Sequence, residues 1–134
     1  MKKIVIVAVL AAVAVGGYFW LSPSPATQES ELGGEIIVPQ FSALAAEGEE
    51  VYNGTCAACH GVNLAGTDNG PTFLQTIYRP AHHSDYAFVS AVQNGVIAHH
   101  WNFGNMPKLD YITNDELVRV ISYIREMQQA NGIL

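Results

Sequence analysis

The sequence predicts a small all-α domain preceded by an apolar transmembrane or signal helix. Three stretches, 43–53, 86–94 and 113–132, combine helical spacing of apolar residues with capping or stop residues. No part of the chain alternates strand-like with helix-like patterns. At 134 residues the chain has room for one small domain and an appendage. We therefore expect an appendage at 1–21, a tether at 22–40 and a helical domain at 41–134.

The first domain helix is predicted to begin after Ser42 as N-cap and to end at Asn53-Gly54. Its predicted apolar face consists of Leu44, Gly48, Val51 and Tyr52. Glycine in mid-helix costs about 1 kcal/mol relative to alanine. A close contact with another helix is the expected reason for Gly48.

The two later helices have equally clear signals. Ser84 or Asp85 begins the short one, Asn94-Gly95 ends it, and Ala87, Val89, Ala91 and Val92 are available for burial. The last helix begins with a capping box, in which Thr113 is the N-cap and Glu116 follows three residues later. Its predicted buried face is Leu117, Val120, Ile121, Ile124 and Met127. Arg119 and Arg125 fall on the other side, where we expect them to be solvated.

Cys56-Ala57-Ala58-Cys59-His60 is the most specific motif of the chain. It contains the only two cysteines, in the C-x-x-C-H pattern that attaches a c-type haem. Each thiol adds to one vinyl group of the porphyrin, and His60 can reach the iron as an axial ligand. A thioredoxin-like pair would need a βαβ pattern, and a disulfide across so short a loop would be strained. A zinc site stays open, because His82, His83, His99 or His100 could supply a fourth ligand.

The N-terminal segment predicts export of the domain. Ile4 to Leu21 are 18 apolar or glycine residues, about 27 Å of helix against a hydrocarbon core of roughly 30 Å. Lys2 and Lys3 place the N-terminus in the cytoplasm, and 18–20 form an aromatic belt. We expect a single-pass anchor in the cytoplasmic membrane with the domain on the periplasmic side. Ala12-Val13-Ala14 leaves a cleaved signal peptide, and a soluble periplasmic form, as the alternative.

Composition limits the partners of the exported part. Four basic and twelve acidic side chains follow Leu21, a formal charge of −8. Nucleic acid is therefore a poor partner, and a positively charged docking surface a natural one. Residues 22–40 are rich in Pro, Ser, Glu and Gly, as in a tether. Within them, the apolar patch 36–39 is a candidate for an extended arm that packs on the domain.

Together, these features resemble the class I cytochromes c. The matching residues are Gly48 and Tyr52 before the haem motif, the motif with Gly61, the segment Gly70-Pro71-Thr72-Phe73, and Met106-Pro107 before the last helix. The resemblance covers about 41–130. It implies one covalent haem c, and a first and last helix that cross with Gly48 and Tyr52 against the last helix. It also implies that the Pro71 carbonyl accepts a hydrogen bond from His60.

The sixth iron ligand is expected in the loop 96–108. Met106 matches the family position, and a thioether ligand raises the reduction potential. Trp101 and Phe103 are expected to line the haem beside it, since so many apolar groups are unusual in an exposed loop. The competing ligands are His82, His83, His99 and His100.

The expected function is one-electron transfer in a respiratory chain, without enzymatic activity. The donor would be a quinol-oxidising complex and the acceptor a terminal oxidase or reductase. Two alternatives stay open. One is a fixed cytochrome subunit of a membrane oxidoreductase; the other is a haem peroxidase or gas-binding protein with an open sixth position.

Overall fold

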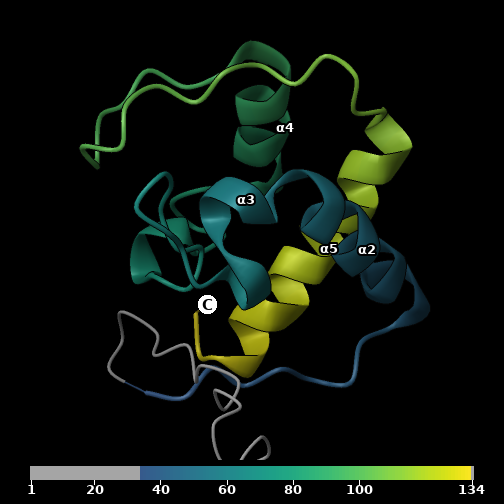
Figure 1. The fold of residues 1–134 in the computed structure, drawn as a ribbon. Coiled ribbons are helices and arrows are strands. Elements are labelled where there is room, and N and C mark those ends of the chain that lie inside the picture. Colours follow the sequence, from purple (N-terminus) through teal and green to yellow (C-terminus); the bar gives the residue numbers. More distant parts are fainter. Residues whose placement is uncertain (1–33, 134) are drawn as a thin grey trace, which may run out of the picture.

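The computed structural model describes residues 34–133, in which helices are joined by long loops (Figure 1). They are α2 (Ala43–Thr55), α3 (Ala57–His60), α4 (Asp85–Asn94) and α5 (Asn114–Ala130), with the short 3₁₀ helices η1 (Val62–Leu64) and η2 (Thr76–Tyr78). No β-strand forms between 34 and 133; Thr67–Gly70 and Val96–Met106 are isolated bridges. The predicted all-α class and its three domain helices are confirmed.

None of the helices in this range is long and apolar enough to cross a bilayer. The predicted membrane or signal helix at 4–21 and most of the predicted tether lie outside the described residues.

Helices α2 and α5 cross at the centre of the fold (Figure 1). A Cβ atom added at Gly48 would collide with the backbone carbonyl of Arg119, so the two helices touch through their backbones. Next to this contact the rings of Tyr52 and Tyr123 pack with centroids 5.2 Å apart. The close helix contact predicted from Gly48 is confirmed.

The predicted face of α2 is wrong in one position. Leu44 is 45% exposed, whereas Ala45 is fully buried with Gly48 and Tyr52. Because the helices approach so closely near Gly48, a small alanine fits where a leucine would not. The predicted end is also too early, since Gly54 has helical backbone and α2 continues to Thr55.

The short helix α4 begins after Ser84, as predicted, but it buries a different side chain. Phe88 is its buried residue, and the four apolar residues expected there are only half-buried. Gly95 ends the helix with φ of 75°, a conformation that favours glycine. Its Cβ position lies 2.7 Å from the carbonyl oxygen of Met106, so glycine also permits a close approach of the next loop.

Arg125 contradicts its predicted solvation. Its side chain is 18% exposed and pairs with Asp85 at 2.8 Å. Its other nitrogens donate to the carbonyl oxygens of Tyr78 and His83 and to the Gln128 side chain, and the guanidinium lies 5.0 Å from the Phe88 ring centroid. Arg125 thus ties α5 to the start of α4 and to the segment before it. Arg119 is likewise paired, with Glu47 of α2 at 2.8 Å.

The apolar patch at 36–39 packs on the domain as an extended arm. Ile36 contacts the core, and the Ile37 backbone exchanges two hydrogen bonds with the Asn131 side chain, of 2.9 and 2.8 Å. The last residues of the predicted tether therefore lie against the end of α5.

Candidate haem-binding site

A cavity of about 670 Å³ occupies the space between α2, α3, α4, α5 and the two long loops. Such a volume is in the range of cofactor sites. Six of the seven site residues predicted from the sequence line this cavity: Cys56, His60, Pro71, Trp101, Phe103 and Met106. The seventh, Cys59, is exposed and is not part of the lining.

His60 is held in one orientation by two contacts. Its Nδ1 lies 3.0 Å from the Pro71 carbonyl oxygen, which only accepts, so Nδ1 carries the proton. Phe73 stacks on the ring with centroids 4.3 Å apart. Burial lowers the pKa of His60 against the opposing effect of the Pro71 hydrogen bond. The imidazole therefore keeps a free lone pair on Nε2.

Cys56 directly precedes α3 and Cys59 lies within it, and the two are not joined by a disulfide. Burial raises the pKa of the Cys56 thiol to about 11, and the nearby Cys59 adds to this. Reactive thiols of redox motifs have lowered pKa values instead. Cys56 thus lacks the lowered pKa of a reactive redox thiol.

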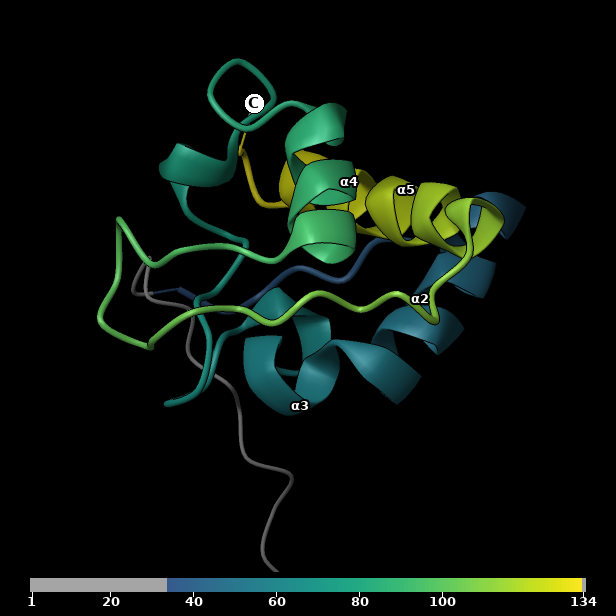
Figure 2. The ribbon, with the colours of Figure 1, turned by 90° about the horizontal axis from the view of Figure 1, so that it is seen from above.

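Met106 enters the cavity from the loop between α4 and α5, which extends away from the helices and turns back (Figure 2). Two backbone hydrogen bonds of 3.0 Å pair Met106 with Val96 and close this loop. The Met106 side chain is half-buried. Closure of the loop thus brings a thioether to the same cavity as His60, 46 residues away in sequence.

Aromatic residues missed in the sequence complete the lining. Tyr78 and Phe88 are buried around Phe73, with ring centroids 5.1 and 5.5 Å from it. Trp101 donates from Nε1 to the Tyr78 hydroxyl at 3.1 Å, and burial raises the pKa of Tyr78. No periodic pattern marks Tyr78 as buried, since it lies in η2 within a long connection. Phe73 belongs to the segment 70–73 that resembles the family, but the sequence does not predict that it stacks on His60.

All four competing histidines also line the cavity: His82, His83, His99 and His100. His99 and His100 are exposed, and His83 is half-buried. The structure thus brings the competitors of Met106 to the same cavity.

The model of the family described as Cytochrome c matches residues 45–128, more than half of the chain. The chain belongs to the cytochrome c family. No curated protein matches it. The cytochrome binds a covalent haem c, for which Cys56, Cys59 and His60 form the attachment motif. The predicted family and cofactor are confirmed, and at this level the protein is a haem-binding electron carrier.

The described residues fit this cofactor. Two free thiols lie beside a cavity lined largely by apolar side chains, and an imidazole with a free Nε2 and a thioether face the same space. These are the donor types that hold haem c.

Proposed function

We propose that this cytochrome is a one-electron carrier whose iron is held by His60 and Met106. The observation that supports it best is the common cavity: His60 lines it with Nδ1 engaged by Pro71, and Met106 lines it from a separate loop. With His60 and Met106 both holding the iron, no substrate would need to reach the metal. The haem supplies reversible one-electron chemistry.

The surrounding residues orient the two ligands. Pro71 holds the proton of His60 on Nδ1 and directs Nε2 into the cavity, while Phe73 limits rotation of the ring. The Val96–Met106 pairing holds the backbone of Met106 at the cavity. A thioether ligand favours ferrous iron and raises the reduction potential.

The cavity wall also determines how a partner approaches. Tyr52, Phe73 and Tyr78 are buried and form the inner wall of the cavity. At the rim, Ile97 is 81% and Phe103 39% exposed. Such an apolar rim suits a brief contact in which electrons pass at an exposed cofactor edge, as in small, weak redox interfaces.

The ligation is tested by replacing Met106. In Met106→Ala the weak far-red Met-to-iron band of the ferric protein should vanish, and the reduction potential should fall because the thioether is lost. Met127→Leu is the matched control, because Met127 is buried in α5 and does not line the cavity. It should keep both the band and the potential. If His99→Ala or His100→Ala alters the iron spectrum and Met106→Ala does not, a histidine is the ligand.

For the wider role, we propose a membrane-tethered shuttle on the periplasmic side that serves a basic partner. The apolar segment 4–21 and the formal charge of −8 after Leu21 support this role. A quinol-oxidising donor and a terminal oxidase or reductase acceptor are the corresponding partners. Electron delivery should slow as salt rises, because the Debye length falls from about 30 Å at 0.01 M to about 8 Å at 0.15 M.

Two outcomes separate the shuttle from its rivals. A fixed subunit would co-purify with one complex in constant stoichiometry, and its turnover would ignore salt. A peroxidase or gas-binding protein would bind carbon monoxide readily at an open sixth position. The shuttle should do neither, and the mass of the membrane-extracted protein should show an uncleaved N-terminus.

A further inference from the structure

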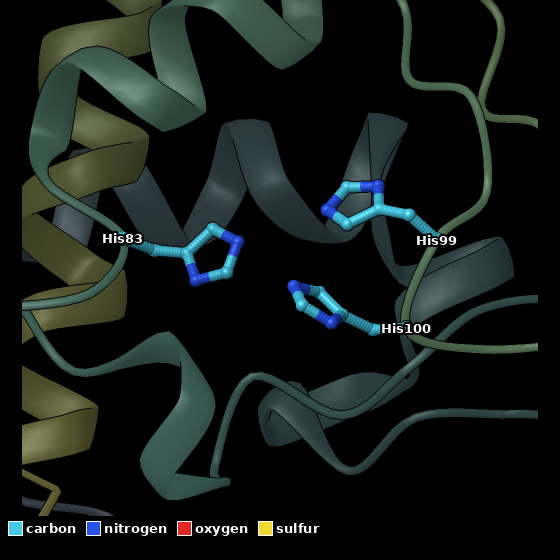
Figure 3. A group of neighbouring side chains, drawn as sticks. All are labelled: His83, His99 and His100. Atoms are coloured by element: carbon cyan, nitrogen blue, oxygen red, sulfur yellow. The ribbon is translucent and has the colours of Figure 1, made fainter.

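We propose that His83, His99 and His100, at the exposed rim of the cavity assigned to the haem, bind a second metal ion in addition to the haem iron. The ion would be a divalent one that prefers imidazole, of the Zn²⁺ or Cu²⁺ class. The three rings come from two segments that are distant in sequence. His83 precedes α4, whereas His99 and His100 lie in the loop after it (Figure 3).

The distances between the rings are close to those of a metal site. One potential ligand atom of each histidine lies within 4.8 Å of the others. Around an ion with metal–nitrogen distances of about 2.0–2.1 Å, two ligand nitrogens are separated by about 3.3 Å in a tetrahedron. Both loop residues are exposed, so small side-chain rotations can shorten the remaining gap.

The orientation of two rings is the second observation. His83 donates from Nδ1 to the Ile77 carbonyl oxygen at 2.7 Å, and His99 does the same to Ile97 at 2.8 Å. Both rings then keep a free lone pair on Nε2, and Figure 3 shows one nitrogen of every ring turned toward the shared space. Metal-bound histidines typically donate their other N–H to a carbonyl in this way.

The backbones that carry these rings are held on both sides. Arg125 donates from Nη2 to the His83 carbonyl oxygen. In the loop, the Ala98 amide donates to the Asn105 side chain at 2.9 Å, inside the segment closed by the Val96–Met106 pairing. The two segments that carry the histidines are therefore already held by hydrogen bonds within the protein.

The donor set determines the class of ion. Three neutral imidazoles and one remaining position for water suit Zn²⁺ and Cu²⁺, whereas Mg²⁺ and Ca²⁺ require oxygen ligands. Asp85, the nearest acidic residue in sequence, pairs with Arg125 and is not part of the group of ligand atoms.

The test is titration of the ferric holoprotein with Zn²⁺ by calorimetry. We expect one equivalent to bind, and zinc-edge X-ray absorption should show nitrogen neighbours at about 2.0–2.1 Å. Loss of a residue that hydrogen-bonds a metal ligand typically weakens metal binding about 10–100-fold. Loss of the ligand itself should weaken it at least as much, so His99→Ala and His100→Ala should each weaken zinc binding at least about tenfold. Both residues are exposed, so these variants should fold.

His82→Ala is the matched control. His82 adjoins the cluster, with ring centroids 5.0 Å from His83 and 6.0 Å from His100, but it is not one of the three proposed ligands. Its loss should change the affinity less than about threefold, a change smaller than that expected for a ligand. Equal losses in all three variants, several weakly bound ions, or no binding would overturn the proposal.

The haem spectrum separates this proposal from the ligation of iron. Zinc binding should leave the far-red band of the ferric protein unchanged, because Met106 stays on the iron. If Met106→Ala retains that band while zinc still binds through His99 and His100, the iron ligation is wrong and the second site stands. If zinc displaces a histidine from the iron, the spectrum changes and the second site is rejected.

Discussion

Gly48 of α2 lies directly against the backbone carbonyl of Arg119 in α5. This contact sets how closely the two helices cross, and with it the position of Tyr52 under the turn that carries Cys56 and His60. Tyr52 donates to the Gly61 carbonyl oxygen at 2.8 Å, immediately after His60. The helix crossing thus supports the haem motif.

Gly48→Ala should destabilise the holoprotein by about 1–3 kcal/mol, because a methyl group has no space beside the Arg119 carbonyl. Gly54→Ala is the matched control. Gly54 is also inside α2, but nothing lies within 4 Å of its Cβ position. Alanine there should stabilise by about 0.5–1 kcal/mol. Denaturant unfolding measures both, and similar effects in the two variants would contradict the close contact.

Tyr52→Phe should cost about 1–3 kcal/mol, because it leaves the buried Gly61 carbonyl without this donor. Tyr123→Phe is the comparison, since the buried Tyr123 hydroxyl finds no hydrogen-bond partner among residues 34–133. Removing that hydroxyl should be neutral or stabilising. Thermal unfolding compares the stabilities of the two variants. A larger loss of stability in Tyr123→Phe would contradict the importance of the Tyr52–Gly61 hydrogen bond.

Arg125→Ala should destabilise by about 1–3 kcal/mol, because it leaves the His83 carbonyl oxygen without this donor and removes one of the two donors to the Tyr78 carbonyl oxygen. Arg119→Ala should cost at most about 1 kcal/mol, since Arg119 is more exposed than Arg125 and its pair with Glu47 lies at the surface. Urea unfolding compares the variants. Equal costs would mean that Arg125 does not organise the wall of the cavity.

Much of the domain was predictable because its signals are local. The capping box at Thr113 and Glu116 and the spacing of Leu117 to Met127 define α5, and all five predicted residues are buried. The haem motif is equally local. Met106 was placed by the resemblance, and the structure brings it to the cavity.

Other features depend on tertiary contacts that no local pattern encodes. Arg125 has the helical position of a solvated residue, but its partners Tyr78 and His83 lie more than 40 residues earlier. Ala45 replaces Leu44 in the core because of the close approach of α5. The grouping of His83 with His99 and His100 appears only when the loop closes on itself.

Stability should depend on pH through Glu116. Hydrogen bonds from the Thr113 side chain and backbone lower the pKa of Glu116 below its ordinary value of 4.5. Because the pKa of Glu116 is lower in the folded state, its contribution to stability is complete above pH 4.5. This contribution is lost as the pH falls through the folded-state pKa. Glu116→Gln should therefore be less stable than the parent at pH 7, and the difference should shrink in acid. Unfolding curves of both proteins between pH 7 and acid test this. A difference in stability that does not change with pH would show that the Glu116 carboxylate is not its source.

The central claim, Met106 on the haem iron, is tested most directly by NMR of the ferrous protein with labelled methionine methyl groups. The chain has three methionines, so at most three signals need assignment. A methyl group bound over the porphyrin face is shielded strongly by the ring current. We predict that one signal is shifted far upfield and that it disappears in Met106→Leu. A Met106 methyl signal in the ordinary region would contradict the account.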